Sequence, residues 1–305
     1  MILRALKLGD LVIATPALRA LVRAFPMHRR VLCTPQPLRP MVRLIGGIDE
    51  VVDTEPLAAI DSKFEHPCVA VNLHGRGPQS TKTLQDLRPT RLIAFGCHAT
   101  PGPQWRAEEH ERVRWCRLLE ESGIAADPDD LQLARSGLPV PPRSVRGATV
   151  IHPGASSGAR MWPADRFAAV ARRELARGRR VVVTGTRSER SVAHAVVEHA
   201  GLPPSANRAG TTTLPELAAI VAHAGAVCSG DTGIAHLATA FGTPSVVLFG
   251  PVSPRQWGPP SDTARHRALW KGIPGDAHAE RPAAGLLLIS VDEVAHALRE
   301  VRSVA

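Results

Sequence analysis

The sequence predicts an α/β fold made of two similar halves, each with a parallel sheet. Short apolar runs alternate with helix-like segments from the N-terminus onward, as in MILRAL, LVIATPALRALVRAF, RRVLC and HPCVAVNL. The alternation stops at SGLPVPPRSVRG, residues 136–147, and resumes with GATVIHPG and RRVVVTGT. Strands that alternate with helices predict parallel pairing. A restart after a segment rich in proline and glycine predicts a second domain.

The chain of 305 residues is long enough for two ordinary domains. We place an N-terminal domain at 1–138, a linker at 139–147, a C-terminal domain at 148–288 and a last helical segment at 289–305. That last segment could cross back to pack on the first domain. Further helices are expected at 108–122, 163–177, 188–201 and 214–224, and the apolar run LLLIS at 286–290 is expected to be a strand.

Composition restricts the class of protein. The chain is 44% hydrophobic and 21% charged, which is typical of a globular protein. Its five cysteines are scattered without a C-x-x-C pair, which argues against zinc and against a disulfide framework and fits a reducing cytoplasm. The N-terminus lacks the uncharged core of a signal peptide, and no uncharged run reaches the ~20 residues of a membrane span. We expect a soluble, cytoplasmic protein, and peripheral contact with the inner face of the cytoplasmic membrane stays open.

The formal net charge of +9 and a pI near 10.3 permit three kinds of partner: nucleic acid, an anionic membrane or phosphorylated small molecules. The arginines are spread along the chain and form no basic block. With no tyrosine, six Phe and five Trp, few aromatic platforms exist for stacking bases. Nucleic acid is therefore not an expected partner.

The first strand-to-helix junction carries a carboxylate. In LKLGD, residues 6–10, Gly9 is expected to permit a sharp turn, and Asp10 lies at a helix N-terminus. Asp10 is either a plain helix cap or a general base at the end of the first strand.

Two junctions of the second half suit a phosphorylated ligand. The loop PGASSGARMWP, 153–163, has small residues that let backbone N–H groups and the hydroxyls of Ser156 and Ser157 approach phosphate, and Arg160 adds a two-pronged donor. Farther along, TGTRSER contains Glu189, either a ligand for ribose hydroxyls or an ordinary first-turn residue.

The fourth junction is SGDTGIAH, residues 229–236. Asp231, Thr232 and Gly233 span the turn, and His236 follows one helical turn later on the same side. A simple helix cap is the alternative. Because the carboxyl ends of parallel strands meet at one sheet edge, we expect the loops of each half to converge.

The loop NLHGRGPQS, 72–80, is a candidate for acceptor contact through His74 and Arg76, together with Gly9. Five further basic residues of the first half either suit an anionic acceptor or are ordinary solvated side chains: Arg39, Arg43, Lys82, Arg88 and Arg91.

Three stretches together resemble glycosyltransferase family 9, the heptosyltransferases of bacterial surface polysaccharide assembly. They are LKLGDLVIATPALRALVRAFP, HPGASSGARMWPADRFAAVA and SGDTGIAHLATAFGTPSVVLFGP, and the resemblance covers nearly the whole chain. It implies a GT-B architecture, in which two Rossmann-like domains with parallel sheets face an interdomain cleft. The acceptor would bind the first domain and a nucleotide-sugar donor the second.

The resemblance also implies the reaction. It would be a transfer of a sugar, heptose from an ADP-linked donor, to a hydroxyl of a glycan, glycolipid or small-molecule acceptor. The transfer would invert the anomeric carbon and need no metal or other cofactor. By position, Asp10 would be the base. Ser156 and Arg160 match the donor-phosphate positions, and Glu189 is a looser match to a ribose ligand.

In the same comparison Asp231, Thr232, Gly233 and His236 match the motif at the diphosphate and sugar. Two departures stand out: Arg160 replaces the lysine of many members, and the C-terminal segment carries Gly275, Asp276 and His278 in place of a cysteine-bearing stretch. That segment is either a donor-side loop or a surface turn. The alternative functions are a GT-B nucleotide-sugar epimerase and a non-catalytic nucleotide-sugar-binding protein.

Overall fold

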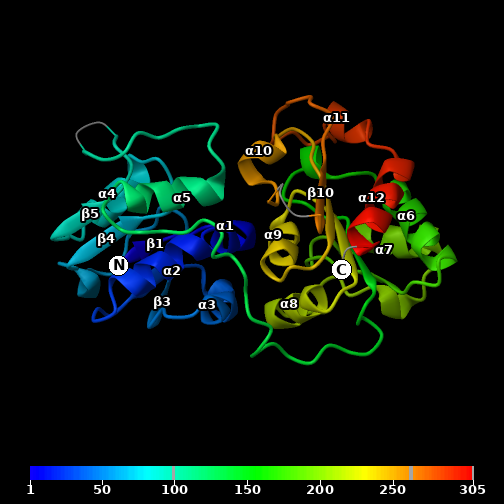
Figure 1. The fold of residues 1–305 in the computed structure, drawn as a ribbon, viewed down its shortest axis with the longest axis horizontal. Coiled ribbons are helices and arrows are strands. Elements are labelled where there is room, and N and C mark those ends of the chain that lie inside the picture. Colours follow the sequence, from blue (N-terminus) through cyan, green and yellow to red (C-terminus); the bar gives the residue numbers. More distant parts are fainter. Residues whose placement is uncertain (98–99, 261–263, 304–305) are drawn as a thin grey trace. The chain divides into compact units, whose positions relative to one another are not determined.

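The computed structural model describes residues 1–97, 100–260 and 264–303. The chain divides into two compact units, Met1–Leu133 (unit 1) and Ala134–Ala305 (unit 2), each an α/β fold (Figure 1). The division comes earlier than the predicted boundary at 138. The predicted linker packs on unit 2, since Val145 is buried and residues 139–142 line a cavity with Ala219 and Ile220.

Unit 1 alternates strands and helices, as its sequence predicts. Its elements are β1 (Ile2–Leu3), α1 (Leu8–Ile13), α2 (Thr15–Ala24), β2 (Val31–Thr34), η1 (Gln36–Leu38), α3 (Arg39–Ile45), β3 (Glu50–Asp53), η2 (Ser62–Phe64), β4 (Val69–Asn72), α4 (Gln79–Gln85), β5 (Arg91–Ile93) and α5 (Glu111–Glu120).

The strands of unit 1 pair in parallel in the order β3-β2-β1-β4-β5. The order reverses between β1 and β4. At such a reversal the connections leave the sheet toward opposite faces, so a crevice opens beyond the carboxyl ends of the strands. The loops that begin at Arg4 and at Leu73 flank this position.

Unit 2 repeats the pattern over a longer stretch. Its elements are β6 (Thr149–His152), η3 (Gly158–Arg160), α6 (Ala164–Ala176), β7 (Val181–Val183), α7 (Arg190–Ala200), η4 (Pro204–Ala206), α8 (Leu214–Ala222), β8 (Ala226–Gly230), α9 (Gly233–Ala240), β9 (Ser245–Leu248), α10 (Pro254–Trp257), β10 (His266–Leu269), α11 (Ala284–Leu287) and α12 (Val291–Ser303).

The sheet of unit 2 is also parallel, in the order β10-β9-β8-β6-β7. Here the order reverses between β6 and β8. The loop after β6 and the loop after β8 are the two that carry the candidate donor residues, so the topology brings them to the same place.

The core of unit 2 includes the last helix. Figure 1 shows α6, α7 and α12 on one face of the sheet and α8 and α9 on the other. The apolar side of α12, with Val294, Leu298 and Val301, is buried in the cluster under α6 and α7. The expectation that this segment could cross back to pack on the first domain is therefore wrong, because its apolar side packs in the core of unit 2.

A buried carboxylate fixes α12 further. Glu174 is fully buried and accepts hydrogen bonds from Thr149 at 2.6 Å and from Arg179 at 3.0 Å, while Arg302 of α12 lies 3.7 Å away. Arg302 also donates to the hydroxyl of Thr149 at 2.7 Å. A buried charge needs such partners to be stable.

The four predicted helices are confirmed as α5, α6, α7 and α8. The predicted strand at 286–290 is wrong: α11 begins at Ala284, and Leu286 and Ile289 are buried in the core. A short apolar run does not by itself distinguish a strand from a buried helical turn. No helix among the described residues is both long enough and apolar enough to span a membrane.

Candidate functional site

Asp10 lies at the carboxyl edge of the unit 1 sheet, as predicted. It is the third residue of α1, and its Oδ2 accepts a hydrogen bond from the backbone N–H of Lys7 at 3.2 Å. The side chain is 24% exposed. Asp10 therefore caps the helix, as one interpretation predicts, and part of its carboxylate is still exposed; its role as a base stays a prediction.

Gly9 has a different role from the predicted one. It is the second residue of α1 and is absent from the described residues with a positive φ. The chain bends before it, at Leu6, whose N–H donates to the carbonyl of Arg4 at 3.0 Å, and Lys7 is extended. Gly9 therefore adds no left-handed turn at this edge.

His74 and its loop follow β4 on the other side of the strand reversal. The backbone N–H of His74 donates to Asn72 Oδ1 at 2.9 Å, and Asn72 in turn donates to Ser80 and Thr81 at 3.0 Å. Burial lowers the pKa of His74, Arg4 acts in the same direction, and Asp10 opposes them. The imidazole is therefore neutral near pH 7. Within the described ranges its buried Nδ1 has no hydrogen-bond partner.

Exposed arginines lie at this edge of unit 1. Arg39, Arg43 and Arg76 come after the carboxyl ends of β2 and β4, and none has a carboxylate within 4.0 Å in the described part of the chain. Elsewhere in the unit most arginines are paired: Arg19 and Arg23 with Asp130, Arg29 with Glu50 and Arg30 with Asp49. Lys82, another of the predicted basic residues, is paired with Asp86. Arg88 and Arg91, exposed just before and at the start of β5, likewise have no carboxylate within 4.0 Å among the described residues, so unpaired positive charge lies at both ends of the strands.

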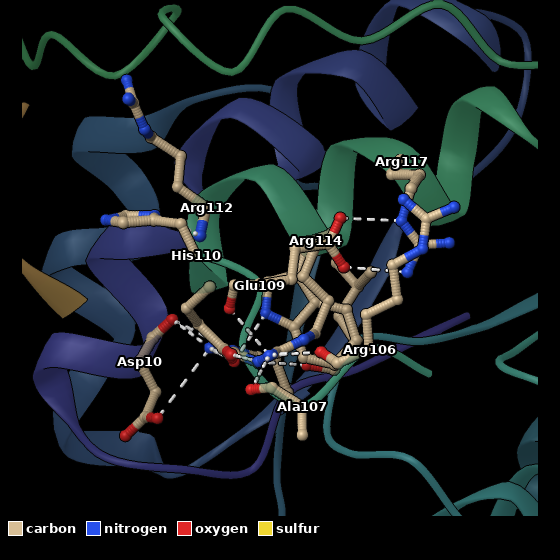
Figure 2. A network of polar contacts seen from close by, with 12 residues as sticks. Asp10, Arg106, Ala107, Glu109, His110, Arg112, Arg114 and Arg117 are labelled. Carbon is tan, nitrogen blue, oxygen red and sulfur yellow. Dashed lines mark hydrogen bonds and ion pairs between the residues drawn. The ribbon is translucent and has the colours of Figure 1, made fainter. Parts of the chain in front are cut away.

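A buried polar network behind Asp10 was not predicted from the sequence. It joins Arg4 to Glu111 of α5, and Arg114 and Arg117 extend it along the helix (Figure 2). One signal was present: Arg4 interrupts the apolar run MILRAL, where a charged residue is rare unless it is paired.

In unit 2 the loop after β6 is held by the C-terminal segment. The hydroxyl of Ser157 donates to the carbonyl of Ala277 at 2.7 Å, and the backbone of Ala159 bonds to Ala279 and Ala283 at 2.8 and 3.1 Å. Ser156 remains exposed. The segment thus packs against the candidate phosphate loop through Ala277 and Ala279, while Gly275, Asp276 and His278 themselves are exposed, so both interpretations of these three residues stay open.

Close backbone packing at two glycines shapes this loop. A Cβ on Gly158 would overlap the carbonyl group of Glu280, and one on Gly230 would lie 2.8 Å from the carbonyl oxygen of Arg160. Only glycine permits such an approach. The turn Gly158–Arg160 can therefore rest on the end of β8.

Arg160 and Asp231 form the central contact of unit 2. Their Nη1 and Oδ2 atoms are 3.0 Å apart, with 25% and 7% of the side chains exposed. The predicted roles of Asp231, to bind sugar hydroxyls or to orient His236, did not include this pair. The carboxylate lies against Nη1 of the guanidinium, a group that carries five N–H donors in all.

The start of α9 adds uncharged donors. Thr232 is its N-cap and Gly233 its first residue, and no side chain caps the helix. The first N–H groups of a helix are unsatisfied and attract anions. The buried hydroxyls of Ser229 and Thr232 have no hydrogen-bond partner within the described residues. His236 packs edge-on against Trp257 at 6.1 Å, a contact that no spacing in the sequence indicated.

Glu189 comes from a different loop, the one between β7 and α7, and its carboxyl group lies against Gly154 of the loop after β6. Its carboxylate accepts from the backbone N–H of Thr186 at 2.7 Å and is 3.7 Å from Nε2 of His152. His152 also contacts the hydroxyl of Thr184 at 3.0 Å. Burial lowers the pKa of His152, and Glu189 opposes that shift. Sequence reasoning did not identify His152 as a partner of Glu189.

The carboxyl edge of the unit 2 sheet thus carries groups that can donate hydrogen bonds to an anion: one half-buried guanidinium, a helix start without a side-chain cap and several hydroxyls. Among the described residues no three His, Cys, Asp or Glu side chains gather in a way that would hold a metal ion.

Comparisons with known proteins agree with this arrangement. A family model described as glycosyltransferase family 9 (heptosyltransferase) matches residues 118–277, a range that contains the donor-binding candidates from Ser156 to His236 and excludes Asp10. Lipooligosaccharide heptosyltransferase 2 of Haemophilus influenzae is 33% identical over 126 residues, which are 39% of this chain. The match spans only 36% of that relative's length.

Solved structures match over nearly the full length. A glycosyl transferase family 9 structure from Veillonella parvula has a TM-score of 0.79 at 19% identity, covering 100% of this chain and 97% of that one. The structure of E. coli heptosyltransferase WaaC with ADP has a TM-score of 0.74 at 15% identity and covers 98% of each chain. At these identities the likeness concerns the fold.

The packing of the loop after β6 predicts that alanine substitutions at Gly158 and Gly275 differ in their effect on stability. Gly158→Ala should destabilise unit 2 by about 1–3 kcal/mol, because the new methyl group overlaps the backbone of Glu280. The same change should weaken the binding of inorganic diphosphate. Gly275→Ala is the control, since its Cβ would lie 3.6 Å from Pro251, an ordinary contact. Thermal unfolding and calorimetry measure both; equal behaviour of the two variants would contradict the packing.

Proposed function

The chain belongs to glycosyltransferase family 9, and on that premise we propose that it moves a sugar from a nucleoside-diphosphate donor to an acceptor hydroxyl. The transfer inverts the anomeric carbon and needs no metal ion. One observation carries the proposal: the Arg160–Asp231 pair lies beside the uncapped start of α9, at the strand reversal of unit 2.

The donor side must stabilise a leaving diphosphate. As the bond between the anomeric carbon and the diphosphate oxygen breaks, negative charge builds up on the nucleoside diphosphate. Arg160, held by Asp231, and the N–H groups of Gly233 and Ile234 offer donors to that charge without reorganisation. The hydroxyls of Ser229 and Thr232 have hydrogen bonds still to make, and Glu189 is suited to the ribose.

We assign ADP and heptose to the donor. Two findings support this assignment: the named activity of the matched relative, a heptosyltransferase, and the ADP that accompanies E. coli WaaC in a structure with the same fold. An epimerase is not favoured, because the family match covers the donor-side residues and describes a transferase.

Asp10 is the base in this proposal. Its partly exposed carboxylate takes the proton of the acceptor hydroxyl while the acceptor oxygen forms the new bond to the anomeric carbon. The proton goes to Asp10, and the bonding electrons leave with the diphosphate. The transition state has oxocarbenium-like character at the sugar, and the reaction forms no covalent sugar–enzyme intermediate.

The acceptor is an anionic glycan or glycolipid. The exposed and unpaired charges of Arg39, Arg43 and Arg76 at the edge that holds Asp10 support this class, and the neutral imidazole of His74 suits a sugar hydroxyl. A glycolipid acceptor would bring the protein to the inner face of the cytoplasmic membrane as a peripheral enzyme.

Loss of Arg160 should weaken nucleotide binding. Arg160→Ala should lower the affinity for ADP by about 1.5–3 kcal/mol, the contribution of a charged hydrogen bond. Calorimetry with ADP, UDP, GDP and dTDP in EDTA measures this, with Arg173→Ala as the control because Arg173 of α6 pairs with the exposed Asp292. Unchanged affinity in Arg160→Ala would remove it from the phosphate site. Binding only after added Mg²⁺ would contradict the metal-free proposal.

Loss of the base should act on turnover alone. Asp10→Asn should lower kcat by about 10²–10⁴-fold and leave the affinity for ADP unchanged, because the amide cannot accept the proton. Release of ADP from ADP-heptose measures the rate, with heptose-deficient lipopolysaccharide or water as acceptor. Asp86→Asn, an exposed partner of Lys82, is the matched control. An equal loss of turnover and ADP affinity would contradict the role of Asp10 as base.

A further inference from the structure

Arg4 is fully buried in unit 1, directly after β1. Burying a guanidinium away from water costs free energy unless other groups accept hydrogen bonds from its N–H donors. Replacing a buried ion pair by apolar side chains often leaves the stability of the fold unchanged. A buried arginine at the carboxyl edge of a sheet therefore raises the question of what it holds.

The contacts of Arg4 converge on Asp10. Nε and Nη2 both donate to the backbone carbonyl of Asp10, at 2.9 and 2.8 Å. Nη2 is also 3.9 Å from the carboxylate Oδ1 of the same residue. The planar fork of arginine fixes the direction as well as the distance of such a contact.

The same side chain ties Asp10 to two other elements. Nη1 donates to the carbonyl of Leu73, which follows β4 and precedes His74. Nη2 lies 3.4 Å from Oε1 of Glu111, at the start of α5. One guanidinium thus links the loops on both sides of the strand reversal to a helix.

Glu111 is itself held in place. It is 5% exposed and accepts hydrogen bonds from Trp115 Nε1 at 2.8 Å and from Arg114. The guanidinium of Arg4 lies 4.9 Å from the centre of the Trp115 ring. Arg114 donates to the carbonyls of residues 106, 107 and 109, so the network continues into the loop before α5, as Figure 2 shows.

We propose that Arg4 is a positioning residue for Asp10 and that Glu111 holds Arg4 for that purpose. This rests on the proposed function, in which Asp10 is the base. With the carbonyl of Asp10 clamped by Arg4 and its Oδ2 bonded to Lys7 N–H, both ends of the residue are fixed. Its carboxylate then meets the acceptor hydroxyl in one place, and a displacement of about 1 Å at a reacting group lowers the rate about 100-fold.

Arg117 offers a contrast within the same helix. It is also buried and ion-paired, with Glu109 and Glu121, and it donates to the carbonyl of Gln104. None of these contacts reaches Asp10. Arg117→Met therefore reports what the loss of a buried, paired arginine does to folding alone.

A double-mutant cycle tests the proposal. Arg4→Met should lower kcat for ADP release from ADP-heptose about 100-fold, and Arg4→Lys, which cannot form the fork, about 10-fold, with KM for the donor unchanged. In an Asp10→Asn background, Arg4→Met should change the residual rate less than about 2-fold, because residues that act as a unit are not additive. Rates are divided by the number of ADP-binding sites, and Arg117→Met should stay within about 3-fold of the parent.

Multiplicative losses in the double variant, or equal losses in Arg4→Met and Arg117→Met, would overturn the positioning role. Full activity of Asp10→Asn would instead contradict the proposed function. Crystal structures of the parent and of Arg4→Lys test the positioning without turnover and without the larger loss of Arg4→Met. The Asp10 carboxylate of Arg4→Lys should be displaced by about 1 Å from its position in the parent, and an unmoved carboxylate would also overturn the proposal.

Discussion

In each unit the strand order reverses between two neighbouring parallel strands, β1 and β4 in unit 1 and β6 and β8 in unit 2. The connections leave toward opposite faces there, and the carboxyl ends of the strands are left open to a ligand. Every candidate residue that the structure brings together follows one of these strands or packs on a loop that does. Asp10 and His74 flank the reversal of unit 1, and Arg160 and Asp231 flank that of unit 2.

The two units handle charge in opposite ways. In unit 1 the buried guanidinium of Arg4 donates its hydrogen bonds to protein groups, and two of them hold the backbone carbonyl of Asp10. In unit 2 Arg160 is a quarter exposed, and its carboxylate partner among the described residues is Asp231. A paired guanidinium of this kind is already oriented before a ligand arrives, and an oriented charge stabilises a leaving group without further reorganisation. The same chemical group is thus fully buried among backbone carbonyls in one unit and partly exposed beside a carboxylate in the other.

Much of this fold could be predicted, because hydrophobic period and glycine-rich junctions are local signals. The junctions at Asp10, Arg160 and Asp231 could be predicted because each lies where an apolar, strand-like run ends and a helix-like pattern begins. What could not be predicted depends on contacts between distant segments: the Arg160–Asp231 pair, the bond from Ser157 to Ala277, and His152 beside Glu189. These link loops from different strands, and no spacing within one loop reports them.

Two wrong expectations have physical reasons of their own. Glycine permits a turn at position 9, but the chain bends earlier, at Leu6, and Gly9 is helical. The last helix has an apolar side that could have suited either domain, but that side faces α6 and the sheet of unit 2, and Arg302 reaches the buried Glu174. Arg4, by contrast, is visible in the sequence as a charge inside an apolar run, and only its partners are not.

The central claim is a single displacement in which Asp10 takes the acceptor proton as the diphosphate leaves beside Arg160. The most direct measurement is the anomeric configuration of the first-formed product, determined by NMR from an ADP-heptose donor of known configuration. The account predicts the opposite configuration to that of the donor. A product with the donor's configuration would require an intermediate on the other face of the sugar, and it would contradict the role of Asp10 as the base of a single displacement.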